Sequence, residues 1–178
     1  MMIRTPSLLL RRFSVEDVAK VFLMSREPGL QEWIPDQVYE DEQQAAKVLR
    51  YLIEKYEDPG DPRLAALVVG ICLQATSELI GHVGLSPLQG EVEIGYAIEA
   101  SHQGRGFASE AVAAMCAFGL EGLGLARILG IVHKDNIASC RVLEKAGLVL
   151  VREEAGTLHG RGGFVRRYEK ARPSCGGR

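Results

Sequence analysis

The chain has 178 residues, of which 47% are hydrophobic and 25% are charged, and its formal net charge is −2 at pH 7. This length predicts one domain with a sizeable core. The near-neutral charge argues against nucleic-acid binding, which normally needs a basic face, and no apolar run reaches the roughly 18 residues of a membrane helix.

The first residues, MMIRTPSLLLRRF, contain three consecutive leucines between arginines. That run is too short for a signal peptide, so we expect a cytoplasmic protein. Cysteines occur at positions 72, 116, 140 and 175, and histidines at positions 82, 102, 133 and 159. The cysteines lack paired or C-x-x-C spacing and the histidines lack ligand or triad spacing, so we expect reduced thiols, no metal site and histidines at loops or strand ends.

The first third of the chain predicts one strand and two helices. Ser14, with Asp17 three residues later, is typical of a helix N-terminus, and Pro28-Gly29 is expected to end that helix. Trp33 lies in an irregular stretch that follows. The expected ranges are a strand over 8–13, an irregular segment over 30–39, an amphipathic helix over 41–56 and a loop rich in breakers over 58–62.

Three strands are predicted next. The apolar run over 64–73 is typical of a strand covered on both faces, and a turn leads from it into a strand over 79–85, so the two form an antiparallel hairpin. Gly81 and Gly84 indicate a bulge or close packing. In the third strand, residues 91–98, one face carries Val92, Ile94, Tyr96 and Ile98, and the other carries Glu91, Glu93, Gly95 and Ala97.

Two further helices and three strands complete the expected order. A helix begins after residues 103–108 and ends at Gly122 and Gly124, and a second helix runs from Asn136 to Gly147. The strands are expected over 127–133, 148–153 and 163–169, with a frayed tail over 171–178. The whole order predicts an α/β protein with a twisted mixed sheet and helices on both sides.

The link between the third strand and its helix is glycine-rich, Gln103-Gly104-Arg105-Gly106-Phe107-Ala108-Ser109. Glycines let an anion approach the backbone, a helix N-terminus favours negative charge, and Arg105 adds a positive charge. The link therefore predicts a phosphate-binding turn, although glycines also occur in turns for steric reasons alone.

Two other phosphate motifs fit this turn less well. The P-loop pattern GxxxxGK[ST] is absent from the chain. Gly104-x-Gly106 matches the start of the dinucleotide pattern GxGxxG/A, but Ser109 ends it. Glu91 and Glu93 in the preceding strand also disfavour a fully buried parallel strand.

Gln103-x-x-Gly106-x-Ala108, after a strand ending in Gly-Tyr-Ala-Ile, resembles the [Gln/Arg]-x-x-Gly-x-[Gly/Ala] signature of the GNAT superfamily of N-acetyltransferases. Residues 136–147, NIASCRVLEKAG, resemble the family's Asn-x-x-Ser…Leu-Glu-Lys-x-Gly-Phe segment, with Leu148 where Phe is usual. The strong resemblance covers residues 91–148. The branch most resembled is the RimJ/RimL-like one, which acetylates protein N-termini and related amines.

The resemblance implies a GNAT fold with about six to seven strands and about four helices, one N-acetyltransferase domain over residues 1–170, and acetyl-CoA as cofactor. It also implies that the turn holds the CoA pyrophosphate and that the third strand splays to offer a backbone N–H to the thioester carbonyl. The implied cofactor-binding residues are Tyr96, Ala97, Ile98, Gln103, Gly104, Arg105, Gly106, Phe107, Ala108, Ser109 and Asn136. Asn136 could also serve only as a helix N-cap.

Acetyl transfer to an amine requires an unprotonated amine and donors for the developing oxyanion and the leaving thiolate. Glu93 shares a strand face with Ala97, so we expect it to be the general base. Glu91 is the second choice and is also expected near the acceptor. A late-strand glutamate, Glu153 or Glu154, stays open because some members of the resembled family use one. Both could instead be solvated surface charges. The resemblance makes Ser139 the candidate donor to the thiolate. It places Trp33 in the acceptor pocket, where Trp33 either contacts substrate or anchors its loop.

The acceptor class follows from amine basicity. An α-amine has a pKa of about 8 and a lysine amine of about 10, so a protein N-terminus is easier to deprotonate and is the expected acceptor. Two alternatives remain open, a small amine such as an antibiotic or polyamine, and a non-catalytic acyl-CoA-binding module. Neither nucleic acid nor a membrane is an expected partner, and a homodimer is left open.

Overall fold

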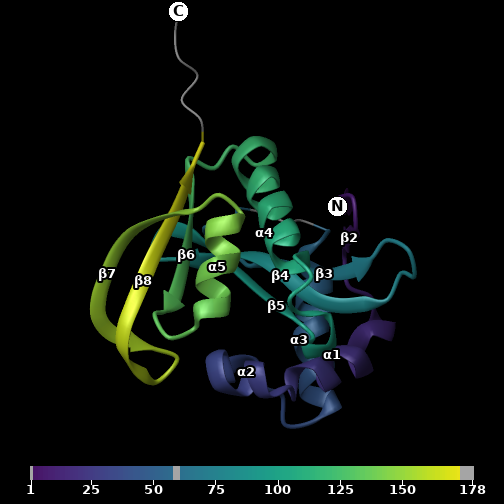
Figure 1. The fold of residues 1–178 in the computed structure, drawn as a ribbon. Helices are drawn as coiled ribbons and strands as arrows, with labels where there is room; N and C mark the ends of the chain where they lie inside the picture. Colours follow the sequence, from purple (N-terminus) through teal and green to yellow (C-terminus); the bar gives the residue numbers. More distant parts are fainter. Residues whose placement is uncertain (1, 58–60, 173–178) are drawn as a thin grey trace, which may run out of the picture.

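The computed structural model describes residues 2–57 and 61–172. Its frame is an eight-stranded sheet in the order β1-β2-β3-β4-β5-β6-β8-β7 (Figure 1). The strands are β1 (Met2–Arg4), β2 (Leu8–Arg11), β3 (Leu67–Leu73), β4 (Leu79–Leu88), β5 (Glu91–Ile98), β6 (Arg127–His133), β7 (Val149–Leu158) and β8 (Arg161–Ala171). Neighbouring strands are antiparallel, apart from the parallel pair β5 and β6.

Helices cover both faces of the sheet. They are α1 (Val18–Ser25), α2 (Pro28–Trp33), α3 (Glu42–Lys55), α4 (Phe107–Ala117) and α5 (Ile137–Lys145), with short turns η1 (Val15–Asp17), η2 (Pro35–Gln37), η3 (Ala100–His102) and η4 (Phe118–Gly122). α4 contacts β2, β4 and β5, and α5 contacts β6 and β7, while α1 and α3 contact β4 and β3. Figure 1 shows α4 and α5 together on one side, and α1, α2 and α3 gathered on the other.

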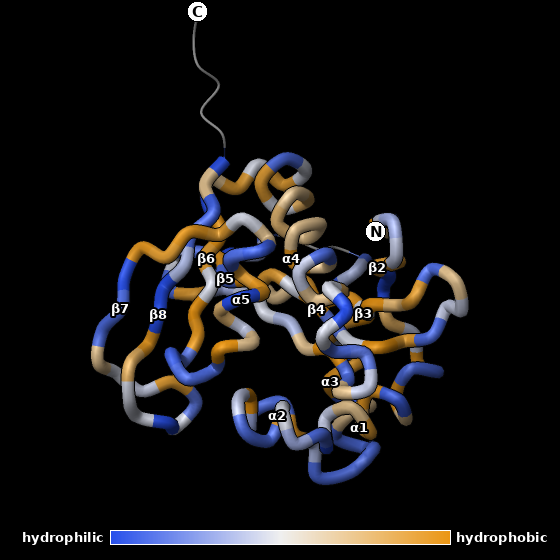
Figure 2. The backbone as a smooth tube through the Cα atoms, in the orientation of Figure 1, coloured by the Kyte–Doolittle hydropathy of each residue, from blue (hydrophilic) through white to orange (hydrophobic). Residues whose placement is uncertain are grey.

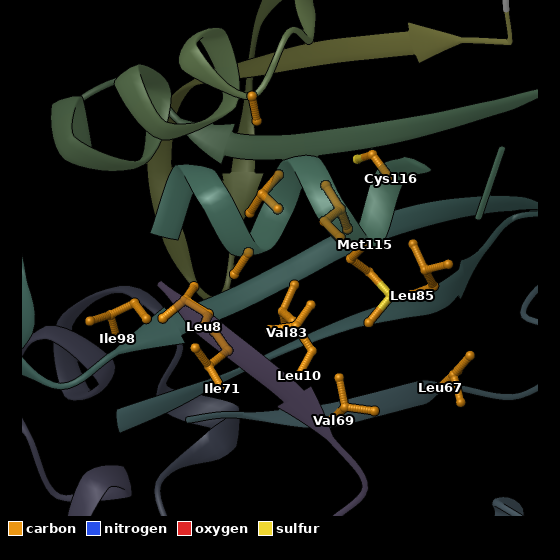
Figure 3. Packing of buried hydrophobic residues seen from close by; sticks show 14 of the residues in the cluster. Leu8, Leu10, Leu67, Val69, Ile71, Val83, Leu85, Ile98, Met115 and Cys116 are labelled. Carbon is orange, nitrogen blue, oxygen red and sulfur yellow. The ribbon is translucent and has the colours of Figure 1, made fainter. Parts of the chain in front are cut away.

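The main core lies between α4 and the middle of the sheet. Met115 points from α4 toward the strands below the helix, whereas Cys116 points away from them (Figure 3), and both are fully buried. The strand residues below the helix that Figure 3 labels are Leu8, Leu10, Leu67, Val69, Ile71, Val83, Leu85 and Ile98. Figure 2 shows hydrophobic chain concentrated along α4 and the inner strands, whereas α2 and the middle of β7 and β8 are mainly hydrophilic.

The structure differs from the sequence-based expectation at several boundaries. The sheet has eight strands and not six to seven, because the short β1 pairs with β2 from Met2 opposite Arg11. Pro28 was expected only to end a helix, yet it also opens α2, where a proline at the first helical position costs no hydrogen bond. The closing hairpin is longer than expected, and β8 extends to Ala171. The expected loop over 58–62 and tail over 171–178 fall partly outside the described residues.

The central strand β5 confirms the expected alternation, since Val92, Ile94 and Ile98 are buried on one face. Against β4 it is paired along its whole length, from Glu91 to Ile98. Against β6, the described residues pair at one position only, Glu93 with Leu129. Beyond Glu93 the two parallel strands therefore separate, and this divergence positions the site described below.

Candidate active site

A cavity of about 660 Å³ occupies the region where β5 and β6 separate. Its walls come from α2, the second half of β5, the start of α4, the end of β6, α5 and the turn between β7 and β8. Because α2 lies on one face of the sheet and α4 and α5 on the other, the cavity reaches both faces. Its volume lies in the usual range for small-molecule sites.

The start of α4 forms a wall built from backbone. Gly104 and Gly106 have φ angles of +74° and +85°, which only glycine adopts readily. A Cβ added at either position would meet nothing within 4 Å, so both face open space. Gly106 is the N-cap of α4, and the amides of the first turn have no helical partner. This wall suits an anion.

Most of the predicted turn residues reach the cavity. Those lining it are Gln103, Gly104, Gly106, Phe107, Ala108 and Ser109. The Gln103 side chain donates from Nε2 to the carbonyl of Ile98 at 2.8 Å, which ties the turn to the end of β5. Arg105 is not among the lining residues, and its guanidinium lies 4.9 Å from the ring centre of Phe107.

The start of α5 lines the same cavity. Asn136 is the N-cap of α5, and its Oδ1 accepts the Ser139 N–H at 3.1 Å, so the expected capping role is confirmed. Both residues line the cavity, as do Tyr96, Ala97 and Ile98 of β5. The Tyr96 hydroxyl lies 2.7 Å from Ser139 Oγ and 3.0 Å from the Ser139 carbonyl oxygen.

The two candidate bases lie in different surroundings. Glu93 lines the cavity, and burial raises the pKa of its carboxyl above the usual value, against a smaller opposing effect of His159. Glu91 is not among the lining residues. Its carboxylate pairs with Arg127, and that hydrogen bond lowers the pKa of Glu91. The geometry therefore favours Glu93 as the group that meets a ligand.

The far end of the cavity is closed by contacts between α2–η2 and the β7–β8 turn. The Arg161 guanidinium lies 4.5 Å from the ring centre of Trp33 and pairs with Glu32 at 3.2 Å. His159 Nδ1 lies 2.8 Å from the Asp36 carboxylate. Trp33 thus lines the cavity and also helps hold the two segments together, so both of its expected roles are compatible with the structure.

His133 supports Trp33 from β6. It is buried, and its ring centre lies 5.9 Å from that of Trp33. Its Nδ1 accepts a hydrogen bond from the backbone N–H of Asp135 at 3.2 Å. Because Nδ1 is the acceptor, the ring proton is on Nε2, which donates to the Gly162 carbonyl at 3.2 Å. A neutral ring satisfies both contacts.

Comparison with known proteins identifies the family. The family described as an acetyltransferase (GNAT) domain matches residues 7–149. The chain belongs to the GNAT acetyltransferases. It is 31% identical over 150 residues to the uncharacterized N-acetyltransferase YnaD of Bacillus subtilis (strain 168), covering 83% of this chain and 82% of YnaD.

Solved structures agree with the fold of this GNAT acetyltransferase. RimL, a ribosomal L7/L12 α-N-protein acetyltransferase in complex with coenzyme A, superimposes with a TM-score of 0.79 at 21% identity, covering 96% of this chain and 98% of RimL. The ribosomal-protein-S5-alanine acetyltransferase of Vibrio fischeri gives a TM-score of 0.80 at 19% identity, covering 98% of each chain. The predicted GNAT fold and N-acetyltransferase class are confirmed.

Several lining residues of the GNAT acetyltransferase were missed in the sequence. Arg141 and Lys145 of α5 line the same cavity as the glycine turn and bring positive charge to it. The two residues are four positions apart and therefore lie on one helix face, so the sequence alone could have indicated this pair of cations. His133, His159 and Arg161 carried no comparable signal, because their partners lie far away in the chain.

One other cluster gathers possible metal ligands. Glu78, Glu99 and His102 place ligand atoms within 4.8 Å of one another. The Lys20 ammonium already contacts both Glu99 oxygens, at 2.7 and 2.9 Å, so we assign no metal to this cluster. Within residues 2–57 and 61–172, none of the helices is both long and apolar enough to cross a membrane.

Proposed function

We propose that this GNAT acetyltransferase transfers the acetyl group of acetyl-CoA to the α-amine of a protein N-terminus, by direct attack in a ternary complex. The observation that carries the proposal is the cavity at the divergence of β5 and β6, which joins a glycine-lined helix N-terminus to a partly desolvated carboxylate. The helix N-terminus can bind a pyrophosphate, and the carboxylate can accept a proton from an amine.

The residues at the glycine turn fit the acetyl donor. The first-turn amides of α4, with Gly104 and Gly106 leaving open space beside them, would hold the pyrophosphate. Arg141 and Lys145 add cations for the phosphates. The side-chain amide of Asn136 can bond the pantetheine arm only through its NH₂ donors and the remaining lone pair of Oδ1, because Oδ1 already caps α5.

The reacting groups meet beside β5. Backbone N–H groups of Tyr96, Ala97 or Ile98 that no longer pair with β6 can stabilise the oxyanion. Glu93 would take the amine proton directly or through water, and its raised pKa makes it a stronger base than an exposed glutamate. Ser139 would donate to the leaving thiolate.

Two considerations support an α-amine acceptor. An α-amine has a pKa of about 8 and a lysine amine a pKa of about 10, so a carboxylate can deprotonate the α-amine more easily. RimL and the S5 acetyltransferase, both similar in fold, are named for ribosomal proteins as their substrates. Small amines remain the alternative acceptors.

The first test is thermal unfolding with acetyl-CoA, NAD or ATP in large excess. A ligand at about a hundred times its Kd stabilises the fold by roughly 2.7 kcal/mol, which raises Tm by several degrees at this size. We expect a rise with acetyl-CoA and not with NAD. Acetyl transfer is then measured on peptides with a free N-terminus, on the same peptides with the N-terminus blocked and a free lysine, and on polyamines.

Each outcome separates the candidate functions. Transfer to free N-termini alone supports the proposal, and transfer mainly to polyamines replaces it with the small-amine alternative. Binding of acetyl-CoA without transfer to any amine would indicate a binding module. No binding of acetyl-CoA would refute the proposal altogether.

A further inference from the structure

The Tyr96 hydroxyl has two hydrogen-bond acceptors within reach and only one proton to donate. It lies 2.7 Å from Ser139 Oγ and 3.0 Å from the Ser139 carbonyl oxygen, and it carries one hydrogen. The carbonyl can only accept, whereas the serine hydroxyl can donate or accept. Two arrangements of the two hydroxyl protons are therefore compatible with the same heavy-atom positions.

The two arrangements differ in what Ser139 can offer a ligand. If Tyr96 donates to the carbonyl, the Ser139 proton points to the Tyr96 oxygen and is unavailable to the cavity. If Tyr96 donates to Ser139 Oγ, the Ser139 proton is free to point at the ligand. The second arrangement costs the carbonyl little, because it lies within α5 and the helix supplies the amide four residues later as a donor.

We propose that Tyr96 is a positioning residue that donates its hydrogen to Ser139 Oγ and thereby directs the Ser139 hydroxyl proton toward the sulfur of coenzyme A. This inference rests on the proposed function, which makes Ser139 the donor to the thiolate. Both O–H bonds stay intact, and each hydroxyl only rotates. The thiolate is stabilised by hydrogen bonding alone, and neither hydroxyl transfers its proton to the sulfur.

The pKa values of the thiol and of Tyr96 determine whether the Tyr96 proton is shared in a hydrogen bond or transferred to the thiolate. A thiol has a pKa of about 8.5 and an ordinary tyrosine one of about 10. Burial raises the pKa of Tyr96 further. Transfer of the Tyr96 proton to the thiolate would therefore be uphill, while a chain of two hydrogen bonds gains from mutual polarisation.

The first readout is a double-mutant cycle on kcat. Tyr96→Phe keeps the ring, removes the hydroxyl and leaves Ser139 free to turn toward its own helix, so we expect kcat to fall roughly tenfold, the worth of one hydrogen bond. Ser139→Ala should lower kcat by at least as much. Because Tyr96 acts through Ser139, the double variant should match Ser139→Ala alone. Additive losses would overturn the inference.

The second readout does not depend on activity. A network that stabilises the thiolate lowers the pKa of the bound thiol, so coenzyme A should release protons when it binds. Calorimetric titration at pH 8 in two buffers of different ionisation enthalpy measures this release. A thiol pKa lowered by one from about 8.5 would release about half a proton per molecule bound. Tyr96→Phe and Ser139→Ala should each reduce that release, and desulfo-coenzyme A should show none.

A matched control is Tyr168→Phe. Tyr168 is also a strand tyrosine whose hydroxyl reaches α5, where it donates to Glu144 at 2.9 Å, but it is fully buried and does not line the cavity. This variant should keep both kcat and proton release. If the wild type neither binds acetyl-CoA nor transfers acetyl, the proposed function and the inference both fail. If the wild type is active but Tyr96→Phe leaves proton release unchanged, only the inference fails.

Discussion

Glu93 lies at a position where keeping its carboxylate charged costs free energy. It lies at the only described position where β5 and β6 pair, and it lines the cavity at the point where the strands separate. Burial raises its pKa, and His159 only partly opposes that effect. A base that is costly to keep charged binds a proton more readily, so the feature that weakens the fold assists the proposed reaction.

Replacing Glu93 with Gln should separate these two consequences. Loss of the base should lower kcat by about 10²–10⁴-fold. Because the folded-state pKa is raised, the charged carboxylate destabilises the fold increasingly as pH rises through that pKa. Glu93→Gln should therefore have a higher Tm than the wild type at pH 8 and nearly the same Tm at pH 4.

Glu91→Gln provides the comparison for both measurements. Glu91 pairs with Arg127, which lowers its pKa, so its charge stabilises the fold above that pKa. This variant should lose stability at neutral pH, although the pair is solvent-exposed and worth little, and its kcat should fall much less than that of Glu93→Gln. A larger loss of kcat in Glu91→Gln would reverse the assignment of the base.

The sequence predicted those site residues whose signal is local. The glycine turn, the alternation that placed Glu93, and the cap at Asn136 all depend on residues a few positions apart. The Tyr96–Ser139 contact spans 43 residues and the Asp36–His159 contact spans 123. Such contacts depend on how strands and loops pack in three dimensions, so no periodicity in the sequence reveals them.

At the scale of elements, the N-terminus of α4 is the part most directly suited to an anion. Its N-cap has the left-handed conformation at Gly106, and no side chain caps the helix. A small polar side chain with a negative charge at this position would enter the space proposed for the pyrophosphate. Asp and Asn tolerate this backbone conformation better than other side chains.

Gly106→Asp and Gly106→Asn therefore form a matched pair. Both add similar bulk and similar backbone strain, and only Asp adds a charge. Gly106→Asn should weaken acetyl-CoA binding moderately, and Gly106→Asp should weaken it by about a further tenfold or more at low salt, with the difference shrinking as salt increases. Calorimetric Kd values at two salt concentrations test this. Equal Kd values would place the phosphates elsewhere.

The β7–β8 hairpin is the second element that bears on function, because its turn reaches α2 through Arg161 and η2 through His159. Arg161→Ala removes both the ion pair with Glu32 and the contact with Trp33. We expect the KM for the acceptor to rise about three- to tenfold while the Kd for acetyl-CoA stays within twofold, because a rim contact of this kind is worth about 1 kcal/mol.

Arg152→Ala is the control on the same hairpin. Arg152 also forms an ion pair, with Glu154, but that pair is exposed on β7 and does not reach α2. This variant should leave the acceptor KM unchanged. An equal rise in both variants would mean that the hairpin acts through its general stability and not through the contact with Trp33.

At the scale of the whole molecule, the inner sheet holds a titratable group that was expected at a loop or strand end. His82 lies within β4 opposite Ala97, beside a small space lined by Met24 and Leu30. Although the residue is only half-buried overall, burial lowers the pKa of its ring to about 4. Charging this ring is therefore easier in the unfolded chain than in the fold.

The stability of the fold should consequently fall in mild acid. Between pH 6.5 and 4 the unfolded state binds a proton at His82 that the folded state does not, so the free energy of unfolding declines as pH falls. By pH 4 the loss should be about 3 kcal/mol, or several degrees in Tm. In His82→Gln this part of the pH dependence should be absent. Parallel Tm–pH curves for the two proteins would contradict the expectation.

The divergence of β5 and β6 has a further consequence for backbone dynamics. Strands at the centre of a sheet normally exchange their amide hydrogens slowly, because both edges are paired. Beyond Glu93, the described part of β5 keeps its β4 partner but has no β6 partner, so every second amide faces the cavity. These central amides should exchange with solvent as quickly as those of a loop. They should become protected when a ligand takes the place of the missing strand.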